Sequence, residues 1–249
     1  MAKFEEAYFK SVNEYLDVKS YENNIHYGKI YCPECHEAPL HIVKKQKIPP
    51  YFASNSQQEH SEDCQHYQEF ISKNNLKRLL ESNSIEDRDR LKFLIDNNLT
   101  GAINLLLKNK PIERNSNHLS DIKSPQSSSQ QTGAYKKESI PRVSIKNILK
   151  NRNTFLENYL VVWGESEIES EVRHPISSIT NKPFIVKNLI FRINGSFRFS
   201  VSLSESKIKH YKELPEQGFK TGFAIFGLLV ERNGYLEIKI ATTKHLKYL

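Results

Sequence analysis

The chain has no apolar run that approaches the ~20 residues needed to cross a membrane. Its N-terminus, MAKFEEAYFK, is acidic and amphipathic, so it lacks the charged-then-apolar pattern of an export signal. Hydrophobic residues make up 38% of the 249 residues, and charged residues 26%. We therefore expect a soluble, cytoplasmic protein that does not have a membrane as its partner.

Cysteine is also scarce, and its three residues are clustered. Cys32 and Cys35 form a C-x2-C pair, and Cys64 follows with His60 four positions before it. A two-residue spacer lets a turn direct both sulfurs at one point, and three thiolates with one imidazole complete the closed tetrahedral shell of a structural zinc (Zn²⁺) site. A disulfide with one free thiol is the alternative, but it suits exported proteins. His66 is a second candidate for the fourth ligand.

The same stretch carries a family resemblance. Its CPEC motif, a basic segment, the sequence PYFAS at 50–54 and the H-x3-C pair resemble the N-terminal zinc module of competence protein CoiA-like proteins over about residues 29–70. The family usually has a P-H-F-A-H pattern, and both of its histidines are absent here, so His60 and Cys64 must complete the site. The resemblance implies an association with DNA processing in bacteria or their mobile elements. It does not by itself imply a nuclease.

Aspartate is absent after Asp121, and charge is unevenly distributed along the chain. Residues 1–140 hold 19 Lys and Arg against 19 Asp and Glu, whereas residues 141–249 hold 17 against 10, which accounts for the net charge of +7. A basic region joined to a neutral one indicates a polyanionic partner, with nucleic acid, and DNA in particular, favoured over a membrane. The alternative is a basic surface that only keeps the protein soluble.

We expect residues 1–110 to form a zinc-binding α/β module with a helical extension. Apolar spacing predicts one amphipathic helix over 3–17, and short strands should flank the cysteine pair until Pro49-Pro50 breaks the last of them. Leucine-rich helices follow, with a break at Gly101. Residues 84–109 are either core of the module or a docking face for a protein partner. Residues 111–140, rich in Ser, Gln and Pro, are predicted to be a flexible linker.

From residue 141 to 249 the pattern changes to the period of two that is typical of strands. It predicts three strands, a short helix and two more strands, namely Tyr159–Val172, Phe184–Ile193, Phe197–Leu203, Ser206–Leu214, Phe223–Glu231 and Tyr235–Ala241. This order and size are typical of an all-β, OB-fold-like barrel; an SH3-like barrel and a small sandwich are the alternatives. The predicted fold class is therefore α+β. A two-residue turn at 233–234 pairs Leu229 with Ile238.

The register of the first barrel hairpin follows from its apolar faces. A three-residue loop at 194–196 brings both apolar sets to one side and pairs Phe191 with Phe199. It also places Arg192 directly opposite Arg198 on one polar face, which is unfavourable unless an anion or an acid lies between them. The predicted nucleic-acid contacts are Arg192, Arg198, Lys187, Lys239 and Trp163, the last as a stacking surface or as core of the barrel.

The sharpest catalytic candidate is the E-x-K sequence Glu237-Ile238-Lys239, a form used by restriction-endonuclease-like nucleases. CoiA-like proteins can carry such a domain. That chemistry needs a second carboxylate on the preceding strand to hold a divalent metal, usually Asp, and residues 141–249 contain no Asp. Binding is therefore our first hypothesis, a nuclease or nuclease accessory subunit the second, and a protein-interaction scaffold the third.

Overall fold

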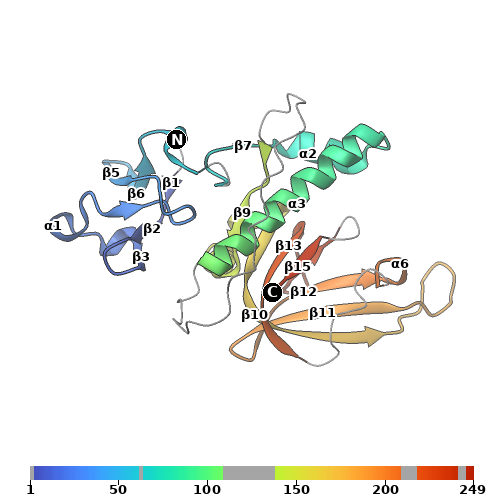
Figure 1. Cartoon of the computed structure of the whole chain (residues 1–249). Coiled ribbons are helices and arrows are strands. Elements are labelled where there is room, and N and C mark those ends of the chain that lie inside the picture. The colour runs from blue at the N-terminus through green and yellow to red at the C-terminus, as the bar shows by residue number, and fades with distance from the viewer. Residues whose placement is uncertain (1–2, 62–63, 109–137, 209–217, 241–244) are drawn as a thin grey trace, which may run out of the picture.

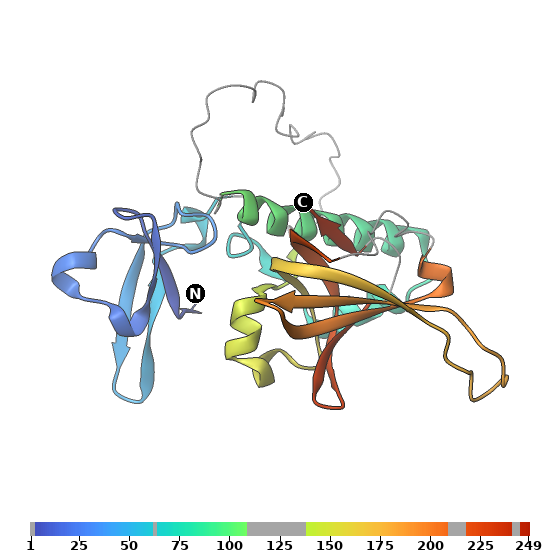
Figure 2. The same cartoon turned by 90° about the horizontal axis from the view of Figure 1, so that it is seen from below.

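The computed structural model describes residues 3–61, 64–108, 138–208, 218–240 and 245–249. A small N-terminal module of short strands lies beside a β-barrel that is crossed by the long helix α3 (Figures 1 and 2). Helices and sheets are both present, as the predicted class requires. Most of the predicted linker, 111–140, lies outside the described residues. Its last residue, Ile140, is fully buried and therefore belongs to a folded core.

Two small three-stranded sheets form the N-terminal module, one with the order β1-β6-β5 and the other β3-β2-β4. The strands are β1 (Lys3–Phe4), β2 (Glu6–Phe9), β3 (Glu14–Asp17), β4 (Ile30–Tyr31), β5 (Leu40–Lys45) and β6 (Ile48–Ser54). Short helical turns lie between them, namely η1 (Val18–Ser20), α1 (Asn23–His26) and η2 (Gln57–Glu59). Apolar side chains of both sheets, among them Phe4, Ile30 and Phe52, surround the three cysteines.

The helix predicted over residues 3–17 is wrong, because the segment forms β1, β2 and β3. Strand β2 pairs with β3 as a hairpin, with Tyr8 opposite Tyr15. Asn13 in the connecting turn has φ +62°, which lies outside the right-handed helical region. The aromatic spacing of this segment fits an amphipathic helix. It also fits a hairpin in which the turn shifts the alternation of side chains between the two faces. Pairing of aromatic side chains across the hairpin favours the second.

The two prolines do not break a strand, contrary to the prediction, since Pro49 and Pro50 both lie inside β6. The register between β5 and β6 is irregular near this point. On its other side, β6 pairs with β1 only through Phe52 and Ala53. The missing proline N–H groups therefore deprive no neighbouring strand of a hydrogen bond.

Two helices follow the module, α2 (Lys73–Glu81) and α3 (Ile85–Lys108). The break predicted at Gly101 is wrong, because α3 continues through this residue. A close approach explains the glycine instead: a Cβ at this position would lie 1.6 Å from Nη1 of Arg142. None of the described helices is long and apolar enough to cross a membrane.

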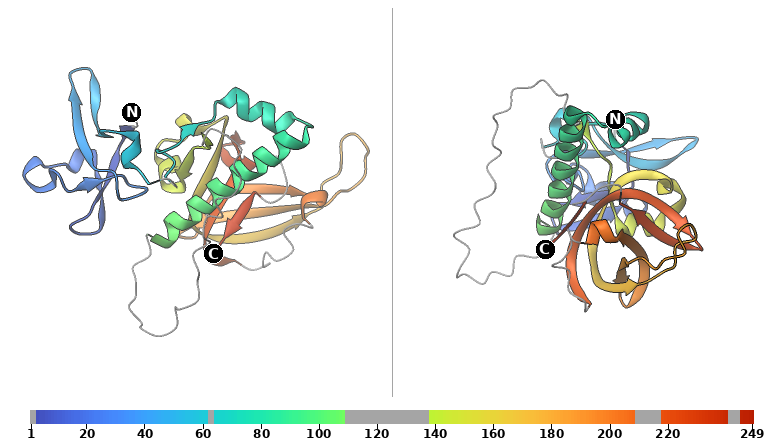
Figure 3. Two further views of the ribbon diagram at one scale, coloured as in Figure 1. Left: turned by 45° about the horizontal axis from the view of Figure 1, so that its top comes forward. Right: turned by 90° about the vertical axis from the view of Figure 1, so that its right-hand side faces the viewer.

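The leucine-rich helices pack on the barrel and do not form the core of the N-terminal module, which corrects the predicted grouping. One buried cluster joins α2 and α3 to the outside of the barrel and contains Ile71, Leu76, Leu79, Leu91, Leu94, Ile95, Leu99, Ala102, Ile140, Val161, Ala224 and Phe226. The left view of Figure 3 shows α3 lying across the strands. Phe93, by contrast, is 69% exposed on α3. Docking of a protein partner on residues 84–109 stays a prediction.

Five strands close into a barrel in the C-terminal region. The order around it is β10, β11, β12, β14, β13 and back to β10, and every pair is antiparallel except β12 with β14. The strands are β10 (Asn158–Arg173), β11 (Val186–Ile193), β12 (Ser196–Ser204), β13 (Phe219–Arg232) and β14 (Tyr235–Lys239), with helix α6 (Glu205–Ile208) after β12. The predicted order of three strands, a helix and two strands is confirmed over the described residues. Residues 209–214 of the predicted helix and residue 241 of the predicted last strand lie outside them.

Several short elements complete the fold and were not predicted. They are β7 (Glu69–Phe70), β8 (Glu138–Ser139), β9 (Arg142–Ser144), α4 (Ile145–Lys150), α5 (Arg152–Phe155) and β15 (Leu246–Tyr248). Strand β7 pairs with β8, β9 runs parallel to β10, and β15 pairs with β13. These pairings connect the chain on both sides of residues 109–137 to the barrel.

The first barrel hairpin has the predicted core register but a different turn. Phe191 pairs with Phe199, as predicted. Beyond this pair the register shifts, so that Arg192 lies opposite Phe197 and the chain turns through the two residues 194–195. The predicted three-residue loop is therefore wrong, and so is the directly opposed pair of Arg192 and Arg198. A β-bulge absorbs the extra residue that the loop was expected to hold.

The second barrel hairpin follows the prediction. Leu229 pairs with Ile238. Asn233 and Gly234 have φ of +52° and +79°, as a type I′ turn requires. Apolar alternation and the turn residues agree in this hairpin, which is why its register could be predicted without correction.

Three phenylalanine rings fill the barrel interior, and their removal gives a first test. Phe191 stacks on Phe199 with ring centroids 4.3 Å apart, and both contact Phe223. We expect Phe199→Ala to lower the free energy of unfolding of the barrel by about 3–5 kcal/mol in denaturant titrations, because it leaves a buried cavity. Tyr235→Ala is the control, since that ring is 62% exposed and should cost less than about 1 kcal/mol. Similar losses for both variants would contradict this description of the core.

Candidate metal centre and nucleic-acid interface

The structure brings Cys32, Cys35, His60 and Cys64 into one buried cluster, with all four ligand atoms within 4.8 Å of one another. Sγ of Cys32 lies 4.0 Å from Sγ of Cys64. Nδ1 of His60 lies 3.6 Å from Sγ of Cys35 and 3.5 Å from Sγ of Cys64. Tetrahedral zinc, with bonds of ~2.3 Å to sulfur and ~2.0 Å to nitrogen, separates its ligands by about 3.5–3.8 Å. The cluster therefore fits a tetrahedral metal ion, and its cysteines form no disulfide.

A tight turn after β4 directs the first two sulfurs. The backbone N–H of Glu34 donates to Sγ of Cys32 at 3.4 Å, and the N–H of His36 donates to the carbonyl of Cys32 at 3.0 Å. His36 closes the turn with φ +60°. A backbone N–H that points at a sulfur stabilises its thiolate. The local chain thus favours the charged form that a metal binds.

The ring of His60 is oriented by β6. Its Nε2 lies 3.2 Å from Oγ of Ser54. With the proton on Nε2, the ring donates to Ser54 and leaves Nδ1 to bind the metal. The alternative ligand, His66, lies outside the cluster: its Nε2 is 3.9 Å from Oε2 of Glu34, and its ring packs edge-on against Phe4.

Hydrogen bonds among the three neighbouring thiols favour the thiolate at one cysteine and the protonated thiol at the other two. Hydrogen bonds from Cys32 first, and then from Cys64, hold the pKa of Cys35 well below its usual range. The hydrogen bond to Cys35 raises the pKa of Cys32 to about 12, and the hydrogen bond to Cys32 raises that of Cys64. A dication bound by all three sulfurs removes this difference, because coordination deprotonates each thiol.

A buried ion pair joins this turn to the barrel. Glu34, between the two cysteines, accepts hydrogen bonds from the guanidinium of Arg142 and, at 2.8 Å, from the N–H of Gln65. Burial raises the pKa of Glu34, and the charge of Arg142 opposes that shift. The side chain of Gln65 in turn bonds the peptide groups of Arg142, accepting from its N–H at 2.8 Å and donating to its carbonyl at 3.2 Å. We call Glu34, Gln65 and Arg142 the junction.

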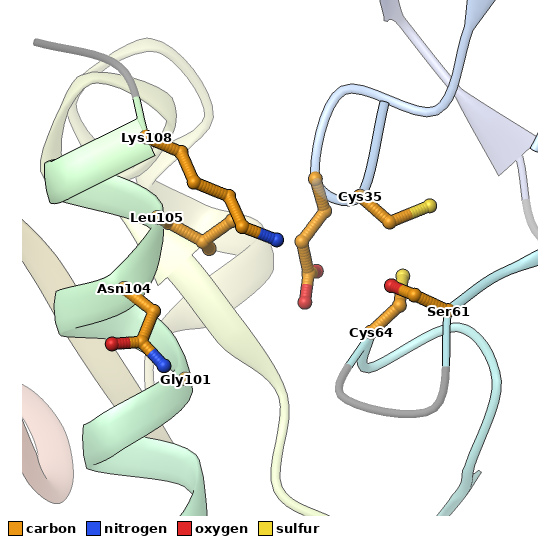
Figure 4. Close-up of a pocket in the computed structure, with 8 residues that line it drawn as sticks. Cys35, Ser61, Cys64, Gly101, Asn104, Leu105 and Lys108 are labelled. Carbon is orange, nitrogen blue, oxygen red and sulfur yellow. The ribbon is translucent and has the colours of Figure 1, made fainter. Parts of the chain in front are cut away.

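The C-terminal end of α3 faces the same point. A small cavity between helix and turn is lined in part by Cys35, Cys64, Gly101 and Lys108. Figure 4 shows the side chain of Lys108 extending from α3 toward the turn. Three thiolates around one dication leave a net charge of about −1. Arg142 and Lys108 therefore place positive charge beside a centre of opposite sign.

The five predicted nucleic-acid contacts do not form one cluster. Arg192 and Arg198 lie near the β11–β12 turn, whereas Lys187 is at the other end of β11, opposite Leu203. Lys239 is exposed on β14, which pairs with β12. Trp163 packs against the cluster between the helices and the barrel. It is therefore partly buried beneath the helices and does not fill the barrel interior.

The two arginines differ in their surroundings. Nε of Arg192 donates to a carboxylate oxygen of Glu169 at 2.9 Å. Glutamates alternate along β10 at 165, 167, 169 and 171, so an acidic strip borders this side of β11. The buried Nε of Arg198 has no hydrogen-bond partner among the described residues. No described carboxylate pairs with Arg198, whereas Glu169 pairs with Arg192, so Arg198 is the arginine whose charge no acid offsets.

Among the described residues, the E-x-K sequence gains no group of acids that could hold a metal ion with it. Glu237 and Lys239 share one side of β14, which pairs with β13 near its turn. Glu231, the acid closest to that turn, lies 3.0 Å from Arg152. Within the described residues, the cysteine–histidine cluster is the one group of three or more side chains placed to hold a metal.

Sequence reasoning missed the junction. Glu34 and Gln65 adjoin metal ligands, but Arg142 is 108 residues from Glu34 along the chain, and no local pattern connects them. Gly101 was a usable signal, because a glycine inside a helix often marks a close approach. The sequence alone favours a break at this residue.

Comparisons with known proteins add no relative: no protein-family model matches the chain, and no curated protein is similar to it.

The metal centre gives a second test. We expect the purified protein to hold one equivalent of zinc, and His60→Ala or Cys32→Ser to lose it, because three protein ligands no longer close a tetrahedral shell. Metal analysis after gel filtration measures this. His66→Ala is the matched control and should keep one equivalent. Loss of zinc from the His66 variant but not from the His60 variant would overturn the ligand assignment.

The junction gives a third test, at Gly101. Alanine has the higher helix propensity, so propensity alone predicts that Gly101→Ala stabilises the protein by about 1 kcal/mol. Its Cβ would instead displace the Arg142 guanidinium from the Glu34 carboxylate, so we expect a loss of about 2–4 kcal/mol in denaturant unfolding. Asn97→Ala, at an exposed site on the same helix, should be neutral or slightly stabilising. A stabilising Gly101→Ala would contradict this account of the junction.

Proposed function

We propose that this protein binds nucleic acid, with single-stranded DNA favoured, through one open side of its barrel, and that its N-terminal module is held by a structural zinc ion. The resemblance of that module to CoiA-like proteins makes DNA processing in bacteria or their mobile elements the proposed setting. Ser54 stands where that family pattern has its second histidine, and its contact with the His60 ring supports a site rebuilt around the H-x3-C pair.

The main observation behind the proposal is the order of the strands in the barrel. A closed five-stranded barrel in which the first strand pairs with the second and fourth, and the third runs parallel to the fifth, is the arrangement of an OB-fold. Helix α6 follows the third strand, between it and the fourth. In OB-folds the outer side of the second and third strands, with adjoining loops, holds oligonucleotides. Here those strands are β11 and β12.

The open side of the barrel supports the same assignment. Helices α2 and α3 cover the outside of β10 and β13. On β12, by contrast, Ser202 and Ser204 are exposed, and Lys239 is exposed on β14 beside it. The acidic strip on β10 makes the β12–β14 side the more favourable path for phosphates. We call this side the β12–β14 face.

An aromatic pair at one end of the β12–β14 face suits base stacking. Phe197 contacts Tyr235 edge-on with ring centroids 5.3 Å apart, next in sequence to Arg198. Tyr235 is largely exposed, unlike Trp163, which the helices partly cover. A single strand held by OB-folds usually combines aromatic stacking with a positively charged groove. Tyr235 thus takes the stacking role that was one of the two alternatives for Trp163.

The metal serves structure in this proposal. Four protein ligands already occupy a tetrahedral shell, so no position is left for a water or a substrate. Zinc is the ion that three thiolates and an imidazole favour at this geometry. Its contribution is to fix the fold of the N-terminal module, since structural zinc binding couples directly to folding.

Arg198→Ala tests the proposed interface. We expect about a 5- to 10-fold loss of affinity for oligo(dT) at low salt, and a salt dependence whose slope falls by about 0.7, because one phosphate contact is lost. Fluorescence anisotropy across a salt series measures both. Arg88→Ala, an exposed arginine on α3, is the matched control and should bind like the parent. Equal affinities for the parent and the Arg198 variant would remove the β12–β14 face as the site.

A further inference from the structure

The β5–β6 hairpin of the N-terminal module is basic and has no role in the interface described so far. Lys44, Lys45 and Lys47 are all exposed at its tip. Residues 38–58 contain no Asp or Glu. None of the three lysines lies within ion-pair distance of a carboxylate among the described residues. Like charges gathered without an acid are unfavourable unless an anion binds there.

A fourth lysine, Lys3, adds positive charge at the base of the hairpin. Nζ of Lys3 lies 5.1 Å from the centre of the Tyr51 ring, on β6. Such a cation–π contact fixes the position of the ammonium group. The sheet β1-β6-β5 thus carries four lysines, one on β1 and three at the tip of the hairpin.

The hairpin is built as a projecting arm. Figure 2 shows it extending beyond the rest of its module. Leu40 and Phe52, at the root, belong to the buried cluster that contains the three cysteines. Pro49 and Pro50 lack the N–H groups that strand addition would use, so the arm is poorly suited to pairing with another protein strand.

We propose that the tip of the β5–β6 hairpin binds the phosphate backbone of duplex DNA, beside the strand held by the barrel. The choice of nucleic acid rests on the proposed function; the choice of a duplex rests on the arm itself. A two-stranded ribbon fits the major groove of a duplex, and lysines contact the phosphates on either side of it. Residues 44–50 at the tip include three lysines and two prolines, and the adjoining ring of Tyr51 is in contact with Lys3, an arrangement less suited to stacking on single-strand bases.

The position of the arm agrees with a duplex bound at the arm and a single strand bound at the barrel. In Figure 2 its tip and the β13–β14 turn, which adjoins Tyr235, point to the same side of the molecule. The right view of Figure 3 agrees. One DNA molecule with a duplex part and a single-stranded part can therefore contact both. The preferred ligand is then a junction between duplex and single strand.

The test replaces the three tip lysines together in the zinc-loaded full chain, as Lys44→Ala, Lys45→Ala and Lys47→Ala. Anisotropy titrations use a short DNA duplex, oligo(dT) and a duplex with a single-stranded tail. We expect the affinity for the duplex to fall at least 10-fold and its salt slope to fall by about 2–3, because each phosphate contact contributes about 0.9. The affinity for oligo(dT) should change less than 2-fold. Zinc content and melting temperature confirm that the variant is folded.

A matched control removes the same charge elsewhere, through Lys19→Ala, Lys29→Ala and Lys92→Ala, all at exposed sites. It should bind the duplex within 2-fold of the parent. Equal losses in both triple variants, or no loss in the tip variant, would overturn the inference. If Arg198→Ala weakens oligo(dT) binding while the tip variant binds the duplex like the parent, the proposed function stands and the inference fails. The reverse pattern supports the arm and removes the β12–β14 face.

Discussion

The contact between Glu34 and Arg142 joins the turn that carries the cysteine pair to the barrel. Glu34 lies inside the metal-binding turn, and Arg142 begins β9, which runs beside β10 of the barrel. Both side chains are buried, so either one alone would leave an uncompensated charge away from water. Glu34 lies between two of the candidate metal ligands, and Gly101 leaves room for the guanidinium of Arg142. One interaction therefore links the metal centre, helix α3 and the barrel.

The two proposed DNA-binding regions depend on that link. The barrel presents the β12–β14 face, and the N-terminal module presents its basic arm from the opposite end of the chain. An arm contributes more to binding when it is held rigidly relative to the barrel, because an unattached arm loses conformational freedom on binding. A second ion pair, between Lys150 and Asp17 at 3.2 Å, joins α4 to the module, but it is largely exposed and contributes little by itself.

The sequence predicted those features that depend on residues close together in the chain. Alternating apolar residues and the Asn233-Gly234 turn sufficed for the barrel strands, and the spacing of Cys32, Cys35 and Cys64 sufficed for the metal cluster. The helix predicted over residues 3–17 is wrong because their aromatic spacing fits two structures, and cross-strand pairing of Tyr8 with Tyr15 favours the hairpin. The Arg192–Phe197 pairing depends on a bulge, and Arg142 meets Glu34 only after the whole chain has folded. No spacing rule reaches across such distances.

Amide hydrogen exchange, compared between zinc-loaded and chelated protein, tests the central link most directly. Loss of the metal releases the turn that holds Glu34, which leaves Arg142 without its buried partner. Chelation should therefore accelerate exchange in β9 and in residues 98–108 of α3 as well as in the metal-binding turn, while β11 and β12 keep their protection. Acceleration confined to residues 3–70 would contradict the account, because the metal centre would then fold independently of the barrel.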